Sequence, residues 1–163
     1  MAELETERLF LRTLKDDDVA IVRILRKNWF DSDEDALKWI RWTNNREHKT
    51  NPYTFFVWLS KTNQLIGSVH FIAHPDLDYE VELGYMIVDE FRRKGYATEA
   101  VKALVEYAFK QAGQEYLTAL IDCENPASRR VVEKLGFNYC GIRMIEREGK
   151  ICKFEHFKLM NSL

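Results

Sequence analysis

Apolar and polar positions alternate along residues 79–88, in the sequence YEVELGYMIV. A period of two is typical of a β-strand with one buried face. After the polar run DEFRRKG at 89–95, apolar residues recur at helical spacing; they are Ala97, Ala100, Val101, Leu104, Val105 and Ala108. The pattern therefore predicts a strand, a tight polar turn and an amphipathic helix, and the rest of the chain is organised around this unit.

The N-terminal part predicts one strand and two short helices. The strand covers residues 6–14, and carboxylates at 16–18 suit the positive end of the first helix. This helix is expected to end near Asn28, with Ile21, Val22 and Leu25 on its buried side. Ser32, followed three residues later by Asp35, predicts the cap of the second helix. The acidic residues at 31–35 are better explained by capping than by attraction of a cationic amine.

The middle of the chain predicts an antiparallel meander that leads into the central strand. Residues 41–52 are polar and have no apolar period, which indicates a loop. Residues 53–59 and 65–72 are rich in aromatic and β-branched side chains, and the turn residues 60–64 between them predict a hairpin. A further turn is expected at 74–76.

The C-terminal part predicts a strand, a helix and a closing hairpin. Residues 116–121 follow the central helix, so this strand should lie parallel to the central strand. Asn125 and Pro126 are typical of the first positions of a helix, which Gly136 should end. Residues 137–145 and 151–159 form the predicted hairpin. The fold class is therefore mixed α/β (α+β), with a mostly antiparallel sheet.

Composition narrows the class of protein. The chain has 163 residues, enough for one domain with a real core, with 46% hydrophobic and 31% charged residues. The net charge of −2 favours neither nucleic acid nor an acidic membrane, and neither a membrane-spanning run nor a signal peptide is evident. Three cysteines without metal-ligand spacing indicate reduced thiols and a cytoplasmic protein. His70 and His74 lack a third ligand, so no metal is expected.

The polar turn before the central helix has the parts of a phosphate cradle. The first amides of a helix lack intrahelical partners, and the dipole makes that end positive. Gly95 would let an anion approach, and Arg92, Arg93 and Lys94 add positive charge. An ordinary surface turn explains these residues about as well. The sequence is neither a nucleotide-triphosphate loop nor a dinucleotide fingerprint, because the required residues are missing.

The turn residues also carry a family resemblance. The spacing Arg92-x-x-Gly95-x-Ala97 resembles the acetyl-CoA pyrophosphate motif of the GNAT superfamily of N-acetyltransferases, and its flanks match as well. Downstream, NPAS at 125–128 and LGF at 135–137 resemble the second cofactor motif of that family. Within that family, the sequence most resembles the branch that contains the ribosomal-protein alanine acetyltransferases. The resemblance runs along nearly the whole chain and is specific from about residue 80 to residue 137.

The resemblance implies a single N-acetyltransferase domain over residues 1–163, with acetyl-CoA as co-substrate and a splayed pair of parallel central strands. Backbone groups of Met86 and Val88 would pair with pantetheine, on a strand edge that a bulge near 84–86 could free. Asn125 would contact the pantetheine arm unless it only caps its helix. The full set of implied cofactor residues is Met86, Ile87, Val88, Arg93, Lys94, Gly95, Tyr96, Ala97, Thr98 and Asn125.

Acetylation of an amine needs a base for the amine and a proton or donor for the leaving thiolate. Glu82 is the first candidate base and Glu80 the second, because they share one strand face roughly 7 Å apart, where one carboxylate could raise the pKa of the other. Simple exposure or ion pairing is the alternative. The resemblance implies that Ser128 assists the thiolate. Many relatives carry a tyrosine seven residues after the asparagine, where this chain has Val132, so a water or another tyrosine could serve instead.

Three functions fit these residues. The first is an acetyl-CoA-dependent N-acetyltransferase acting on a primary amine, such as a protein N-terminus, a polyamine or an antibiotic. The second is a non-catalytic acyl-CoA-binding module, and the third is a binding domain for another phosphorylated ligand. The sequence identifies neither the acceptor nor the oligomeric state, which we expect to be a monomer or a homodimer.

Overall fold

One mixed sheet organises the computed structural model, which describes residues 2–45, 53–74 and 77–162. The strand order within the described residues is β1-β2-β3-β4-β5-β6-β8-β7. Among these described strands β5 and β6 pair in parallel, and the other pairs are antiparallel. The strands are β1 (Glu3–Glu5), β2 (Leu9–Arg12), β3 (Tyr53–Leu59), β4 (Leu65–His74), β5 (Glu80–Ile87), β6 (Tyr116–Asp122), β7 (Asn138–Arg147) and β8 (Lys150–Met160). The predicted mixed, mostly antiparallel sheet is confirmed.

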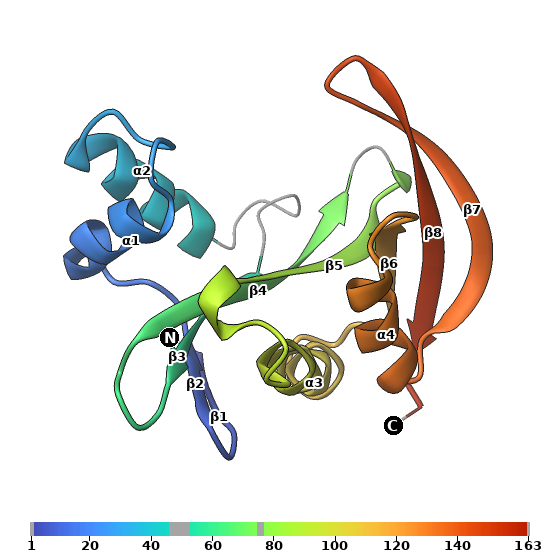
Figure 1. Ribbon diagram of the computed structural model, residues 1–163, viewed down its shortest axis with the longest axis horizontal. Helices are drawn as coiled ribbons and strands as arrows, with labels where there is room; N and C mark the ends of the chain where they lie inside the picture. Colours follow the sequence, from blue (N-terminus) through green and yellow to red (C-terminus); the bar gives the residue numbers. More distant parts are fainter. Residues whose placement is uncertain (1, 46–52, 75–76, 163) are drawn as a thin grey trace.

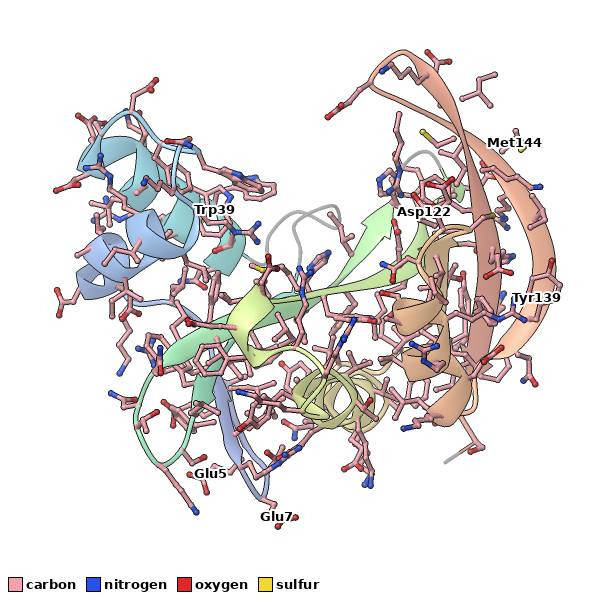
Figure 2. The ribbon with its side chains drawn as sticks, viewed as in Figure 1. Glu5, Glu7, Trp39, Asp122, Tyr139 and Met144 are labelled. Atoms are coloured by element: carbon pink, nitrogen blue, oxygen red, sulfur yellow. The ribbon has the colours of Figure 1, made fainter. Side chains whose placement is uncertain are left out.

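Helices cover both faces of this sheet. Figure 1 shows α3 on one side of β4 and β5, with α1, α2 and the β7–β8 hairpin rising on the other side. The hairpin ends the sheet at β7, on which Figure 2 labels Tyr139 and Met144. The helices are α1 (Val19–Leu25), α2 (Asp33–Asn44), α3 (Tyr96–Lys110) and α4 (Pro126–Lys134), with short 3₁₀ turns at Asp16–Asp18 and Asp89–Phe91.

Two apolar clusters hold these layers together, one on each face. The larger cluster joins the sheet to α3, whose Ala100, Val101, Leu104 and Ala108 are buried as their spacing predicts. The smaller cluster lies under α1 and α2 and includes Val22, Ile40, Phe56 and Trp58. Strand β3 serves both, because neighbouring side chains of a strand point to opposite faces. Its aromatic residues are therefore buried on both sides.

The N-terminal half differs from the sequence-based predictions in several places, and the first predicted strand, over residues 6–14, is shortened to Leu9–Arg12. A short strand, β1, precedes the predicted first strand and pairs with it. The first helix ends at Leu25, not near Asn28, and Ile21 is 36% exposed rather than buried. The second helix continues to Asn44 through residues that were predicted to be a loop. Residues 46–52 of that loop, and the turn residues 75–76, lie outside the described residues.

Two glycines allow β4 and β5 to approach each other closely. A side-chain carbon built on Gly67 would lie 2.1 Å from the Met86 carbonyl oxygen, and one on Gly84 would lie 2.6 Å from the His70 ring. The Met86 carbonyl is main chain and cannot move away without disturbing the ladder. Gly67 therefore fixes how tightly β4 holds the end of β5.

We expect Gly67→Ala to destabilise the protein by about 3 kcal/mol, because overpacking against backbone cannot be relieved by a rotamer change. Gly113→Ala is the matched control. Gly113 has φ +67 but nothing within 4 Å of the added carbon, so only backbone strain of about 1 kcal/mol is expected there. Urea unfolding of both variants measures the difference, and equal losses would contradict this role of Gly67.

Candidate active site where two strands separate

Strands β5 and β6 touch at one point and then separate. Their only paired position in the described chain is Glu82 opposite Thr118. In contrast, β5 pairs with β4 from Glu80 to Ile87 without a register shift, and every residue of β6 pairs with β8. The separation therefore arises between the two parallel strands, and the bulge expected near residues 84–86 is absent from the pairing with β4.

The open edge of β5 presents the backbone of alternate residues. The N–H of Val88 donates to the carbonyl of Ile66 at 2.8 Å, so Val88 faces β4. Successive residues of a strand direct their backbone groups to opposite neighbours. Met86 therefore also faces β4, whereas Tyr85 and Ile87 face the gap. The structure thus differs from the expectation that Met86 and Val88 offer their backbone groups to a ligand.

The predicted phosphate cradle is the turn at residues 89–95 that follows β5, and hydrogen bonds from two arginines hold it in place. Gly95 adopts φ +82 as the N-cap of α3, a left-handed conformation that suits glycine. The Arg92 Nε donates to the Ile87 carbonyl at 2.9 Å, and the Arg8 guanidinium donates to the Lys94 carbonyl at 2.9 Å. These two arginines hold the turn from both sides, so the first amides of α3 lie at a fixed place beside the gap.

A second brace ties the N-terminal segment to the start of α3. The Glu99 carboxylate accepts hydrogen bonds from Thr6 Oγ1 at 2.6 Å and from the Arg8 backbone at 2.9 Å, and it pairs with the Arg8 guanidinium at 2.7 Å. Burial acts to raise the pKa of Glu99, but these hydrogen bonds and the Arg8 charge outweigh it, so the pKa is lowered. Glu99 therefore stays ionised and keeps this brace closed at neutral pH.

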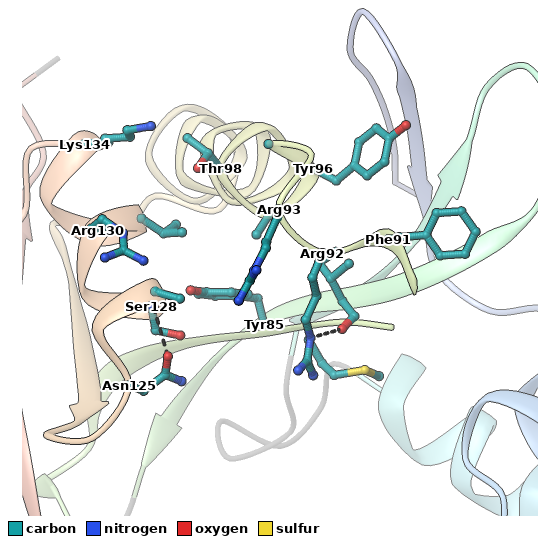
Figure 3. Close-up of a pocket in the computed structure, with 16 residues that line it drawn as sticks. Tyr85, Phe91, Arg92, Arg93, Tyr96, Thr98, Asn125, Ser128, Arg130 and Lys134 are labelled. Carbon is teal, nitrogen blue, oxygen red and sulfur yellow. Dashed lines mark hydrogen bonds between the residues drawn. The ribbon is translucent and has the colours of Figure 1, made fainter. Parts of the chain in front are cut away.

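A cavity of about 640 Å³ lies between the end of β5, the turn and α4, as Figure 3 shows. Two of the predicted cofactor residues, Val88 and Lys94, do not line it. The predicted residues that do are Met86, Ile87, Arg93, Gly95, Tyr96, Ala97, Thr98, Asn125 and Ser128. Arg92, which the sequence analysis placed in the phosphate cradle, also lines the cavity. The sequence analysis did not assign the other lining residues to a site, and these are Tyr85, Phe91, Ala127, Arg130, Val131 and Lys134.

Positive side chains surround this cavity on two sides. Arg92 and Arg93 come from the turn, and Arg130 and Lys134 come from α4. Figure 3 shows Arg93 reaching from the turn towards the space between α4 and Tyr85. Arg130 and Lys134 are four residues apart, so they share a helix face; this spacing was the signal that could have identified them. The arrangement suits a ligand with several phosphate groups.

The first turn of α4 places Asn125 and Ser128 at the cavity. The Asn125 side-chain oxygen accepts a hydrogen bond from the Ser128 backbone at 3.1 Å, so the predicted capping role of Asn125 is confirmed and only its amide is left for a ligand. The Tyr85 side chain crosses the gap from β5 towards Ser128 (Figure 3). Burial raises the pKa of Tyr85, and a hydrogen bond with Ser128 offsets part of that rise. A protonated tyrosine therefore lies beside the serine.

The two candidate bases lie on the other face of β5. Glu82 is 3.3 Å from the Arg147 guanidinium. Glu80 bonds with Thr118 and Arg143, each at 3.0 Å. Burial acts to raise the pKa of Glu80, but these hydrogen bonds and the Arg143 charge outweigh it, so the pKa is lowered. The idea that one carboxylate raises the pKa of the other is therefore wrong for Glu80.

Comparison with known proteins decides the family. The sequence profile of the acetyltransferase (GNAT) domain matches residues 8–138. The chain belongs to the GNAT acetyltransferase family. The resemblance drawn from the turn motif is thus confirmed, and the protein is an acyltransferase.

Three relatives show how far the similarity extends. YoaA, an uncharacterized N-acetyltransferase of Bacillus subtilis, is 28% identical over 149 residues, which cover 85% of this chain and 84% of YoaA. A Vibrio cholerae structure, described as a "putative ribosomal-protein-serine acetyltransferase", is 26% identical with a TM-score of 0.74 and covers 98% of this chain and 97% of its own. RimL, a ribosomal alpha-N-protein acetyltransferase solved in complex with coenzyme A, shares the fold at 16% identity and a TM-score of 0.77, with 98% of each chain covered.

This GNAT acetyltransferase has a second, smaller cavity on the face of the sheet that carries Glu82. Its volume is about 150 Å³, and it lies between α1, α2 and strands β3 and β4. The partly buried His70 lines it. Burial, and to a smaller extent the charge of Arg26, lower the pKa of His70 to about 4. His70 is therefore neutral at physiological pH.

Three further observations concern metal ligands, thiols and membrane spans in the described residues. They contain no group of three or more side chains able to hold a metal ion. Cys123, Cys140 and Cys152 are free thiols. No helix in the described segments is both long and apolar enough to cross a bilayer.

The low pKa of His70 should make folding stability depend on pH. Between pH 6.5 and about 4 the unfolded chain binds a proton on His70 that the folded protein excludes, so stability falls as the pH falls through this range. The gap between 6.5 and about 4 corresponds to about 3 kcal/mol. Urea unfolding at pH 7.5 and pH 4.5 should show a smaller acid loss for His70→Gln than for the unmodified protein. Identical losses would contradict the assignment.

Proposed function

We propose that this protein transfers the acetyl group of acetyl-CoA directly to a primary amine. The observation that carries the proposal is the single ladder pair between β5 and β6, which leaves a strand edge open beside a cavity lined by four cationic side chains. A long, anionic ligand with a hydrogen-bonding arm fits such a site. The family membership and the coenzyme A bound to the similar RimL fold support the choice of acetyl-CoA.

In this proposal the pantetheine arm extends β5 as an added strand. It would pair with backbone groups of Tyr85 and Ile87, which face the gap, while Met86 also lines the cavity. Amides at the start of α3, between Arg93 and Thr98, would bind the pyrophosphate. Arg130 and Lys134 would neutralise phosphate charge from the side of α4.

Glu82 would remove the proton from the attacking amine through a water molecule. The amine nitrogen then attacks the thioester carbonyl carbon, the C–S bond breaks, and the thiolate leaves. Glu82 suits this role better than Glu80, because Thr118 and Arg143 already engage Glu80 and lower its pKa. Arg147 would hold the Glu82 carboxylate in place at 3.3 Å.

Ser128 would donate to the departing thiolate, with Tyr85 behind it. The tyrosine found in many relatives is replaced here by the buried Val132, so the donor must come from elsewhere. Tyr85 approaches Ser128 from β5, and its pKa, which burial raises, keeps its proton available. Ser128 would thus give its proton to the thiolate and take one from the Tyr85 hydroxyl.

A non-catalytic acyl-CoA-binding module is the alternative. The observation that favours it is the replacement of the usual tyrosine by Val132, together with the engagement of Glu82 by Arg147. Both functions place one domain, over residues 1–163, in the cytoplasm as a monomer or homodimer. They differ in whether thiol is released when an amine is present.

Thiol release from acetyl-CoA with a panel of amines tests the proposal. Glu82→Gln should lower kcat/KM about 100-fold or more, because it removes the base. Ser128→Ala and Tyr85→Phe should each lower kcat by about tenfold, a typical effect of losing one hydrogen-bond donor, with less effect on the KM for acetyl-CoA. Glu90→Gln is the charge control, since Glu90 is exposed on the turn.

The outcomes separate the two functions. Unchanged turnover in both Glu82→Gln and Ser128→Ala would refute the assigned catalytic residues. Binding of acetyl-CoA without thiol release for any amine would favour the non-catalytic module.

A further inference from the structure

The smaller cavity combines a guanidinium, an imidazole and aromatic walls. Arg26 lies at the end of α1, and Trp39 and Trp42 belong to α2. The strands contribute His70 together with the hydroxyls of Thr54 and Ser68. Trp39, labelled in Figure 2, packs against the smaller apolar cluster. A pocket with one cation and several neutral donors is suited to an anion.

Among the described residues, Arg26 has no counter-charge. Its Nε is enclosed and has no hydrogen-bond partner, and no carboxylate of the described residues pairs with its guanidinium. The contact recorded for it is with the Trp29 ring, 4.2 Å from the guanidinium carbon. Burial lowers the pKa of Arg26, which indicates that its charge is poorly solvated. A half-buried cation without a partner is unfavourable unless a ligand supplies the anion.

The cavity lies one strand away from the end of β5. His70 pairs with Gly84, and Ser68 pairs with Met86; such pairs lie about 5.5 Å apart between Cα atoms. The His70 ring packs directly over Gly84, where a side chain could not fit. Glu82 follows on the same face of β5. An amine near Glu82 would therefore place a short attached group over His70 and Arg26.

We propose that Arg26 binds a carboxylate of the acceptor, so that the substrate is a small amine that also carries a carboxylate. This inference rests on the proposed function for the amine, and on the cavity alone for the anion. Arginine suits the role because its planar fork matches both carboxylate oxygens. Neutral His70 and the two hydroxyls complete the set of donors without adding a second cation.

The acidic side chains at the start of α2 do not form a binding site for a cationic acceptor. Asp33 pairs with Arg23, and Glu34 pairs with Lys38. Asp35 bonds with Ser32, which caps the helix. These carboxylates are engaged within the protein, so a polyamine would lose the Arg26 contact and find little attraction in exchange.

Paired acceptors test the proposal most sharply. Amino acids of increasing length, from glycine to 6-aminohexanoate, are compared with their amides, and spermidine serves as the cationic acceptor. The best carboxylate should exceed its amide at least about tenfold in kcat/KM, as expected for a charge-assisted hydrogen bond. In Arg26→Gln this ratio should fall close to one, while the KM for acetyl-CoA stays unchanged. Arg26→Lys should give an intermediate ratio.

Lys27→Gln is the matched control. Lys27 is the next residue, is exposed, and does not line the cavity, so its ratio should equal that of the unmodified protein. The proposal is overturned if the amides or spermidine are the better acceptors, or if Arg26→Gln and Lys27→Gln change the ratio alike. Circular dichroism establishes that each variant is folded.

A binding measurement separates this inference from the proposed function. Trp39 and Trp42 line the cavity, so tryptophan fluorescence should report titration with the same amino acids in the presence of CoA. Saturable changes in the unmodified protein that are lost in Arg26→Gln support the anion site even if no amine is acetylated, in which case the proposed function fails alone. Equal titration curves for the two proteins would refute the anion site, whether or not amines are acetylated.

Discussion

The architecture of the site depends on one constraint: β5 and β6 are each held firmly by an outer neighbour but meet each other at a single position. Eight residues of β5 are in register with β4, and seven residues of β6 are in register with β8. The Thr118 hydroxyl also donates to Glu80 at 3.0 Å, beside the one shared pair. Beyond this point the two strands diverge, and the backbone edge of β5 remains open to a ligand.

Because of this separation, the two faces of β5 border different parts of the site. One face borders the cationic cavity, where the turn and α4 converge, and the other carries Glu82 and lies beside the small cavity at His70. The two glycines of the β4–β5 pair matter for this reason. Gly67 lets β4 hold the end of β5 closely, and Gly84 makes room for the imidazole on the acceptor face. The proposed reaction takes place where these two faces meet across the open edge.

Much of this fold could be predicted from local patterns. The alternation at 79–88, the helical spacing after Ala97 and the cap at Asn125 each follow from short-range physics, and the structure has all three. The motif from Arg92 to Ala97 also located the cavity. Ile21 was predicted wrongly because an apolar residue on a short helix can lie on either side of its stripe, and only the packing of α1 on α2 decides which.

The remaining features depend on contacts between distant parts of the chain. Arg8 lies far in sequence from the turn that it braces, and Arg26 lies far from the strands that line its cavity, so nothing local indicates either placement. The direction of the β5 backbone is set by its pairing with β4, which no single strand reveals. The arginines opposite Glu80 and Glu82 come from the last hairpin, some 60 residues later. For these features the sequence shows the residue types but not the partners.

Thermal melting with nucleotides tests the central claim, that the open edge of β5 and its cationic cavity bind acetyl-CoA. A ligand that binds only the folded state must raise the melting temperature. We expect acetyl-CoA and CoA to raise it clearly and ATP, which lacks the pantetheine arm, to leave it almost unchanged. A failure of saturating acetyl-CoA to raise the melting temperature, or an equal rise with ATP, would contradict the account.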